Sequence, residues 1–389
     1  MKYQDRQTLM LDEIRHYLLQ SQVSGSENKQ SVILTPNKID RLYQKSWNLK
    51  WHLYSESIQE KFLSQLPKWI GFYTSGHTQK PTLWLREIKQ LLKEVEILSK
   101  VCQTNKIDGV ITFAPIHHLY GFLFSLLLPA INKVPVWFCP MNAPGSLSYP
   151  ELRNPLFVTI PSALNYMKRR VQDFDQYNSI TIVHSTALLP ATALQLSEKL
   201  KHKKLNFVEL FGSTETGLIA VRKPKSEVEI PWELVSDVTF ANVHLHREGF
   251  LEIYSPRIAS NSKHMRPTSW RLNDFVEVLS PKTFLFKGRK SRLLKINGQR
   301  INLDRVEKAV RQAIACRDLA CVPVRDDIRS ERFDLFLVCD SQKITTTEQI
   351  RSMCKKILSK AEQPRRVVLT PKLKRTSTGK LSWQNKLSV

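Results

Sequence analysis

The chain has 389 residues, 42% hydrophobic and 24% charged, a composition typical of soluble globular proteins and long enough for two domains. The charged N-terminus is unlike a secretory signal peptide, and the apolar run at 119–131 is too short to span a bilayer. Six cysteines without a Cys-x-x-Cys pair indicate the reduced thiols of a cytoplasmic protein.

The formal net charge of +24 is unusual and unevenly distributed. Residues 282–389 hold 26 lysines and arginines against 10 aspartates and glutamates, an excess of 16 positive charges. Such a field attracts acidic partners, and a nucleic acid, an acidic carrier protein and an anionic membrane surface all fit it. A positive charge that serves only to keep the protein soluble explains the excess equally well. Because we find no nucleic-acid recognition motif and no membrane span, we expect no specific nucleic-acid partner and no transmembrane segment.

Secondary structure is predicted from the periodicity of apolar residues. Residues 1–70 carry a mostly helical pattern, whereas short apolar runs alternate with helical stretches from there to residue 220. The expected strands are 69–73, 106–113, 134–139, 156–160, 180–184 and 205–211, and the expected helices are 83–98, 122–131, 161–167 and 194–200. This alternation predicts a mostly parallel sheet covered by helices. From residue 221 the pattern becomes β-rich, with strands at 243–245 and 250–254 around a Glu248-Gly249 turn.

A loop of small polar residues, TSGHTQKP at 74–81, follows the strand 69–73 and precedes the expected helix 83–98. Strand, polar loop, lysine and helix form the layout of a phosphate-binding loop, in which backbone N–H groups and hydroxyls hold phosphates. The candidate nucleotide-binding residues of this loop are Thr74, Ser75, Gly76, Thr78 and Lys80.

The central stretch of the chain is LNFVELFGSTETGLIA at 205–220. An apolar strand ends there in Gly212, three hydroxyls and one carboxylate, at the edge where open α/β sheets bind ligands. A hydroxyl can donate to a phosphate oxygen, and Glu215 beside phosphates suits Mg²⁺, a hard cation that prefers oxygen ligands. Taken alone, the same pattern also fits a simple turn between two strands.

The FGSTETG stretch closely resembles the aromatic-Gly-Ser-Thr-Glu-x-Gly signature of the adenylate-forming superfamily, which includes acyl- and aryl-CoA ligases, peptide-synthetase adenylation domains and firefly luciferase. Further resemblances follow the superfamily order over residues 70–389: TSGHTQKP at 74–81, PIHHLYG at 115–121, WRLND at 270–274, KGR at 287–289, LLKINGQRI at 293–301 and TSTGK at 376–380. The first departs from the superfamily pattern at His77 and Gln79, and Ser291 occupies a hinge position that is commonly Asp or Lys.

This resemblance implies an α/β fold with two domains. The large domain, 1–288, is expected to have mostly parallel sheets covered by helices plus a β-rich subdomain, and it is N-terminally shortened because the phosphate loop begins at residue 74. A small mobile α+β domain is expected at 289–389.

The resemblance also implies roles for individual residues. Thr214 contacts phosphate, Glu215 holds Mg²⁺, and Lys380 stabilises the first transition state, which makes these three the catalytic candidates. The nucleotide also contacts Phe211, Gly212, Ser213, Asp274 and Arg289, with the last two on the ribose. The acyl pocket is lined by His118, Ser185, Thr186 and Ala187.

The implied reaction uses ATP and Mg²⁺ to convert a carboxylic acid to acyl-AMP and then transfers the acyl group to a thiol. Amino-acid-activating members use an aspartate soon after the His118 segment, and residues 120–133 contain no acidic residue, so an aryl or short-to-medium acyl acid is expected. The acceptor is coenzyme A or an acidic acyl carrier protein, and the breadth of the basic charge favours the carrier protein. The alternative is a catalytically impaired protein that binds nucleotide or acyl-AMP as a regulator, which the departures at His77, Gln79 and Ser291 allow.

Overall fold

The structure is a computed structural model, and it describes residues 10–16, 18, 31–35, 42, 45–74, 81–141, 145–185, 191–224, 230–296, 299–326, 330–339 and 346–373. The chain divides into two compact units. Unit 1 contains Met1–Val243, Glu252–Trp270 and Pro281–Thr283, and unit 2 contains His244–Leu251, Arg271–Ser280 and Phe284–Val389.

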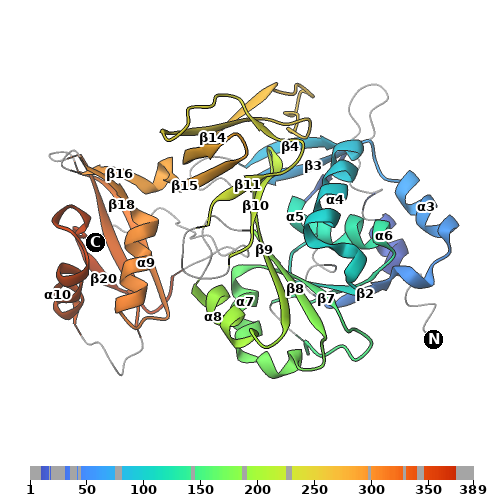
Figure 1. The fold of residues 1–389 in the computed structure, drawn as a ribbon, viewed down its shortest axis with the longest axis horizontal. Coiled ribbons are helices and arrows are strands. Elements are labelled where there is room, and N and C mark those ends of the chain that lie inside the picture. The colour runs from blue at the N-terminus through green and yellow to red at the C-terminus, as the bar shows by residue number, and fades with distance from the viewer. Residues whose placement is uncertain are drawn as a thin grey trace. The chain divides into compact units, whose positions relative to one another are not determined.

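Five parallel strands form the centre of unit 1 (Figure 1). Their order is β6-β5-β7-β8-β9, with bounds β5 (Gly109–Thr112), β6 (Pro135–Phe138), β7 (Pro155–Thr159), β8 (Ser179–His184) and β9 (Lys204–Ser213). Every residue of β5 and β6 is buried, as expected for parallel strands covered on both faces. Antiparallel strands extend the sheet at both edges of this group. At one edge β2 (Trp47–Lys50) pairs with β6, and at the other β10 (Gly217–Arg222) pairs with β9 and β11 (Trp232–Leu234) pairs with β10. The predicted parallel sheet covered by helices is confirmed for these five central strands, whereas the flanking pairings of the same sheet are antiparallel.

Helices cover these strands on both sides (Figure 1). On one side lie α7 (Pro161–Arg169) and α8 (Ala191–Lys199), whose apolar side chains share a core with β5, β7 and β8. On the other lie α4 (Ile88–Cys102), α5 (Leu119–Phe122), a π-helical segment at Leu123–Leu127, and α6 (Leu128–Asn132). As predicted, the stretch around 122–131 is almost entirely buried, and Pro161 stands in the first turn of α7.

The predicted helix at 83–98 is wrong for residues 83–87. They belong to β4 (Thr82–Glu87), which pairs antiparallel with β3 (Trp69–Thr74) in a three-stranded sheet of order β1-β3-β4, with β1 at Ser31–Leu34. Helix α4 begins only after Glu87, because the side chains of Glu87 and Gln90 form a reciprocal capping box there. The phosphate loop therefore connects two antiparallel strands instead of a strand and a helix.

The helical prediction for residues 1–70 is confirmed only in part. Residues 10–16 are helical and α3 spans Glu56–Ser64, but 31–34 and 47–50 are the strands β1 and β2. In β2 the residues alternate between buried and partly buried, a period of two that marks a strand covered more on one face.

The β-rich segment contains β12 (Thr239–Phe240), β13 (Glu248–Tyr254), β14 (Ser269–Ser280) and β15 (Thr283–Arg289), in that order. The predicted strand at 243–245 is wrong, since Leu245 makes only an isolated bridge to Val278. The next residue, His246, has a φ of 57°, in the left-handed region, which interrupts an extended chain. Glu248 and Gly249 lie within β13 and not in a turn.

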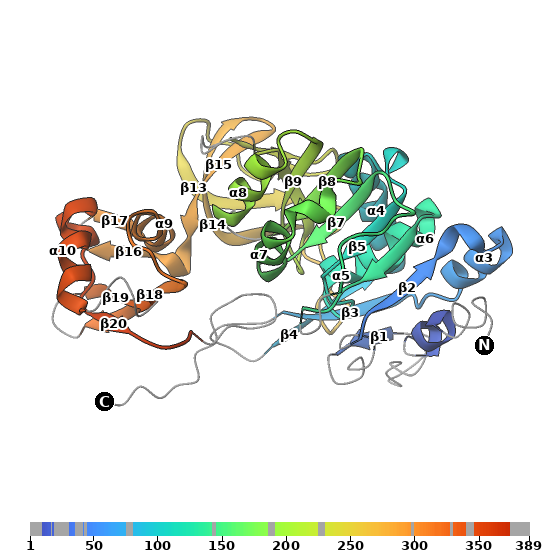
Figure 2. The ribbon, with the colours of Figure 1, turned by 90° about the horizontal axis from the view of Figure 1, so that it is seen from below.

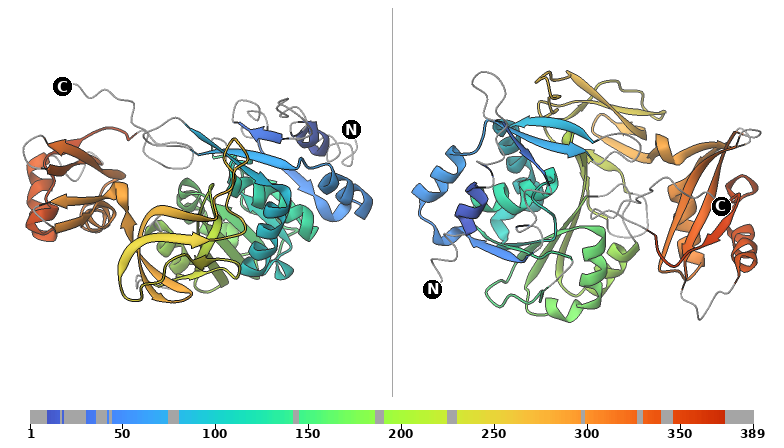
Figure 3. Two further views of the ribbon diagram at one scale, coloured as in Figure 1. Left: turned by 90° about the horizontal axis from the view of Figure 1, so that it is seen from above. Right: turned by 180° about the vertical axis from the view of Figure 1, so that it is seen from behind.

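In its described residues, the rest of unit 2 combines two small sheets with the helices α9 and α10 (Figures 2 and 3). Its strands are β16 (Leu293–Ile296), β17 (Gln299–Asn302), β18 (Asp318–Asp326), β19 (Ser330–Val338) and β20 (Val367–Leu369), and its helices are α9 (Leu303–Ala313) and α10 (Thr347–Ile357). One apolar core joins both helices to β16–β20. Helix α9 starts where the Asn302 side chain accepts from the N–H groups of Asp304 and Arg305. Among the described helices, none has the length and hydropathy needed to cross a membrane.

Candidate active site

The turn between β9 and β10 is closed by two of its own hydroxyls. The hydroxyl oxygens of Ser213 and Thr216 lie 3.0 Å apart, and each accepts from the other residue's backbone N–H. Thr216 is fully buried and also donates to the carbonyl of Gly217. These two side chains therefore hold the shape of the turn.

Thr214 and Glu215 form the tip of this turn and are partly exposed. Within the described residues, neither the Thr214 hydroxyl nor the Glu215 carboxylate has a hydrogen-bond or ion-pair partner. No group of three metal-binding side chains accompanies Glu215 in that part of the chain. One free carboxylate fits Mg²⁺, which is commonly held by one or two carboxylates together with substrate phosphates and water.

Glycines are required at both ends of the tip. A Cβ on Gly212 would collide with the carbonyl of Gly217. Gly217 has a φ of 70°, and a Cβ there would meet the side chains of Arg86, Glu94 and Arg257. The backbone of the turn thus packs directly against charged side chains.

Those charged side chains form a buried network that the sequence did not reveal. Glu94 lies 3.2 Å from Arg86 and 3.4 Å from Arg257, and Arg257 makes a bidentate pair with Asp237 at 2.8 and 2.9 Å. Burial lowers the pKa of Arg86 to about 10, against the opposing effect of Glu94, so the guanidinium stays charged at neutral pH. Nothing in the sequence around Glu94 or Arg86 indicated that the helical carboxylate and the strand arginine would be buried together.

The strand before the tip ends in a buried aromatic ring. Phe211 packs against Trp232 with ring centroids 5.2 Å apart, and the Arg222 guanidinium lies 4.3 Å above the same indole. Arg222 also pairs with Glu209 at 2.5 Å. Since the Phe211 ring is buried, the exposed surface of this segment is at Gly212 and the tip.

Two of the acyl-pocket candidates, His118 and Ser185, lie within the described residues. His118 precedes α5, and its ring centroid lies 4.1 Å from that of His117. The Tyr120 hydroxyl donates to the carbonyls of Thr159 and Val183, which ties α5 to the ends of β7 and β8. Ser185 follows β8 and is exposed.

His184, the residue before Ser185, is fully buried. Its Nδ1 lies 2.9 Å from the Thr159 hydroxyl, and burial lowers its pKa to about 4. The imidazole is therefore neutral at physiological pH and supports the end of β8 as an uncharged group.

In unit 2, the structure brings together the two ribose candidates. Asp274 on β14 is buried, and its Oδ1 accepts from Arg289 Nε at 3.0 Å at the end of β15.

Of the phosphate-loop candidates, the structure describes Thr74, which ends β3 and donates to the carbonyl of Thr82. The remaining candidates, Ser75, Gly76, Thr78, Lys80, Thr186, Ala187 and Lys380, lie outside the described residues.

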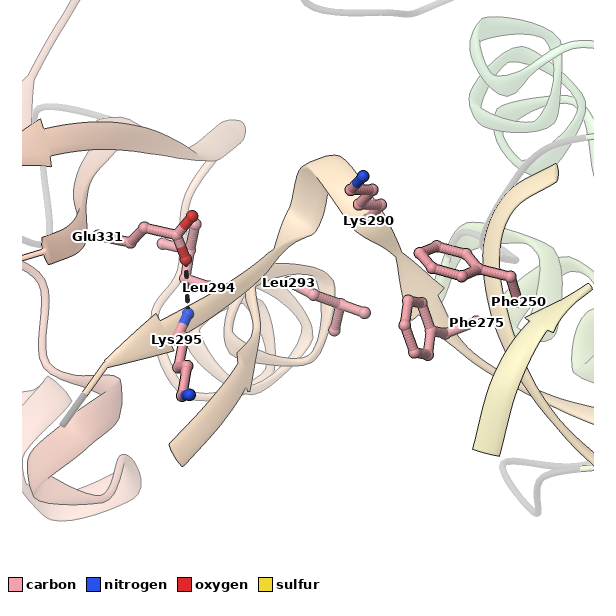
Figure 4. Close-up of a pocket in the computed structure, with 7 residues that line it drawn as sticks. All are labelled: Phe250, Phe275, Lys290, Leu293, Leu294, Lys295 and Glu331. Atoms are coloured by element: carbon pink, nitrogen blue, oxygen red, sulfur yellow. Dashed lines mark hydrogen bonds between the residues drawn. The ribbon is translucent and has the colours of Figure 1, made fainter. Parts of the chain in front are cut away.

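A cavity of about 410 Å³ lies in unit 2 beside the predicted hinge (Figure 4). Its walls are Phe250, Phe275, Lys290, Leu293, Leu294, Lys295 and Glu331. The two phenylalanine rings pack with centroids 4.2 Å apart, and Arg271 and Lys290 lie over Phe250. The Glu331 carboxylate accepts from the Lys295 backbone N–H at 2.7 Å.

Comparison with solved structures identifies the fold. The O-succinylbenzoate coenzyme A synthetase of Bacillus subtilis, solved in complex with ATP and magnesium ion, superposes with a TM-score of 0.63 at 15% sequence identity, covering 80% of this chain and 68% of that one. The chain has the fold of the adenylate-forming enzymes, so the predicted fold class is confirmed.

Sequence comparisons give two named relatives. A 4-coumarate–CoA ligase of Cereibacter sphaeroides is 23% identical over 314 residues, covering 80% of this chain and 69% of that enzyme. One of Halorhodospira halophila is 27% identical over 224 residues, covering 55% and 54%. The chain thus spans between 54% and 69% of the length of these relatives.

A family model also matches part of the chain. Residues 305–380 match the one described as AMP-binding enzyme C-terminal domain. The predicted resemblance to the adenylate-forming superfamily is confirmed.

Proposed function

We propose that the chain is an acid–thiol ligase that activates a carboxylic acid with ATP and passes the acyl group to a thiol. The observation that carries this proposal is the tip of the β9–β10 turn. There, among the described residues, the Thr214 hydroxyl and the Glu215 carboxylate make no hydrogen bond or ion pair, while Ser213 and Thr216 hold the backbone. A hydroxyl and a carboxylate kept available at the carboxyl edge of a parallel sheet suit phosphate and its metal.

In the first step the substrate carboxylate attacks the α-phosphate of ATP, which forms acyl-AMP and releases pyrophosphate. Thr214 donates to a phosphate oxygen, and Glu215 holds Mg²⁺, whose charge offsets that of the phosphates. Asp274 accepts from the ribose hydroxyls beside Arg289. Lys380 contributes positive charge where the carboxylate and the α-phosphate meet, because both groups are anionic and repel each other.

The substrate we propose is an aryl or short-to-medium acyl acid. The segment 120–133, which follows the His118 position, contains no carboxylate to pair with a substrate ammonium group. Two relatives named 4-coumarate–CoA ligase favour an aromatic acid within that class.

The acceptor we propose is a thiol on an anionic partner, either coenzyme A or an acidic acyl carrier protein. The names of the relatives support coenzyme A. The basic C-terminal quarter supports either one, since both carry negative charge. We further propose that residues 1–288 and 289–389 act as the large and small domains, which rotate about Ser291 between the two steps.

The test is pyrophosphate release from Mg²⁺–ATP across a panel of aryl, fatty and amino acids. We expect release with aryl or short-to-medium acyl acids, and we expect Lys380→Ala to abolish it. Lys372→Ala is the matched control, because Lys372 is an exposed lysine of the same tail.

Release only with amino acids would contradict the substrate class. ATP binding without release for any acid would favour the alternative, a regulator that binds nucleotide or acyl-AMP, which the departures at His77, Gln79 and Ser291 allow.

A further inference from the structure

A network of four charged side chains lies beneath the β9–β10 turn. Arg86 comes from β4, Glu94 from α4, Arg257 from the segment after β13, and Asp237 from the segment after β11. The side chains of Arg86, Glu94 and Arg257 belong to residues that are at most 2% exposed. Two guanidinium groups and two carboxylates give a net charge of zero, joined by the ion pairs described above.

The network makes hydrogen bonds to the backbone on both sides of the tip. Arg86 donates to the carbonyl of Thr214 at 3.2 Å. On the other side, the Leu218 N–H donates to Glu94 at 2.8 Å, and Arg257 donates to the Leu218 carbonyl at 2.6 Å. The backbone that carries Glu215 is therefore held at Thr214, the residue before it, and at Leu218, three residues after it.

A second set of bonds supports Glu215 from the segment that follows β13. The Ala259 N–H donates to the Glu215 carbonyl at 2.7 Å. Gln90 of α4 donates to the carbonyls of Pro256 and Ile258, and Arg86 donates to that of Arg257 at 2.5 Å. Thus α4 and β4 fix the segment 256–259, which in turn fixes the tip.

Stability alone is a weak explanation for such a network. Burying charged groups costs hydration free energy, and well-packed apolar replacements of buried ion pairs are often neutral or stabilising. Here most of the contacts that the network makes outside itself end on the tip backbone or on the segment that supports it. The network therefore acts on the position of the tip.

We propose that Arg86, Glu94, Arg257 and Asp237 are positioning residues that hold the Thr214–Glu215 tip for Mg²⁺–ATP and, because their four charges cancel, add no net positive charge beside the Glu215 carboxylate that attracts the metal. This inference rests on the proposed function of the tip. Removing the Glu94 charge would leave one uncompensated guanidinium near Glu215. Its positive charge would repel Mg²⁺ but would not repel the anionic ATP.

The experiment is calorimetric titration of ATP into the full chain, with chelator and at a series of Mg²⁺ concentrations. For Glu94→Gln we expect the Mg²⁺ concentration that half-maximally promotes ATP binding to rise on the order of tenfold, as an uncompensated nearby charge predicts. Metal-free ATP binding should stay unchanged or tighten. A purely structural role would instead weaken both measurements together, and that result would overturn the proposal.

Asp334→Asn is the matched control. Asp334 is 2% exposed and accepts from Arg365 and Arg366 within unit 2, so its loss also removes a buried charge beside two arginines. We expect its Mg²⁺ dependence to equal that of the wild type, and an equal shift in both variants would also overturn the proposal.

Asp237→Asn is the second test variant, in case Glu94→Gln does not fold. It removes a charge from the less buried end of the network, and a smaller shift of the same sign is expected. A wild-type chain that binds no ATP at any Mg²⁺ concentration would overturn the proposed function together with this inference. Normal binding by the wild type with unchanged Mg²⁺ dependence in both variants would overturn the network alone.

Discussion

At the scale of single residues, the hydroxyls of the β9–β10 turn have two different tasks. The Ser213 and Thr216 hydroxyls bond to each other and to the turn backbone, whereas the Thr214 hydroxyl has no hydrogen-bond partner among the described residues. Chemically similar side chains one or two positions apart are therefore expected to respond differently to the same substitution.

We expect Thr216→Val to destabilise the protein and Thr214→Val to spare stability but impair the reaction. Thr216 is fully buried, so removal of its hydroxyl leaves turn groups unpaired and should cost about 2 kcal/mol of unfolding free energy. Thr214→Val should lower kcat on the order of a hundredfold, the size seen when one transition-state donor is lost. Urea unfolding and pyrophosphate release measure the two effects. Equal loss of stability in both variants would contradict this division.

At the scale of elements, two arginines enclose the predicted hinge. Arg289 at the end of β15 is held by Asp274 of β14. Arg292 donates to Asp304 and Glu307 of α9 and to the Cys321 carbonyl of β18. Only Lys290 and Ser291 lie between these two anchored positions, so a rotation at this point would concentrate its φ/ψ changes in two residues.

We expect Ser291→Pro to separate the two steps of the proposed reaction. Proline fixes φ near −65° and restricts the residue before it, so the rotation between steps should be blocked while one arrangement remains active. Single-turnover assays should show a loss of thioester formation much larger than the loss of acyl-AMP formation. Lys290→Ala, which leaves the backbone unrestricted, is the control. An equal decrease in both steps would argue against a hinge at this position.

At the scale of the whole molecule, part of the positive charge of the C-terminal quarter lies on exposed helix surfaces. Lys308 on α9 and Lys355 and Lys356 on α10 are exposed, and no ion pair involves them in the described part of the chain. These lysines are therefore available to an acidic partner and are not occupied in holding unit 2 together.

Charge reversal at Lys308, Lys355 and Lys356 tests whether the acceptor is a carrier protein. If an acidic carrier docks on this surface, the apparent KM for the carrier should rise several-fold and its salt dependence should weaken, because screened long-range attraction is lost. The KM for coenzyme A and for the acid substrate serve as internal controls. A carrier KM that does not change would rule out docking through these helices.

The sequence by itself determined the fold class and the superfamily resemblance, because both depend on local patterns: apolar runs of strand or helix length, and short motifs such as FGSTETG. It also predicted which residues meet the nucleotide, and those roles remain predictions. Local pattern failed at 83–87, where the pairing of β4 with β3 overrode a helical periodicity, and at 243–245, where a left-handed residue ends the extended chain.

Only the tertiary structure decided what holds the tip. Arg86 and the carbonyl that it contacts on Arg257 are 171 positions apart, and each charged residue of the network looks like ordinary protein surface in the sequence. A buried charge is stable only with its partners in place, and those partners are brought together by folding from β4, α4 and the segments after β11 and β13. Periodicity and motifs describe neighbours along the chain, so this support for Thr214 and Glu215 became visible only in three dimensions.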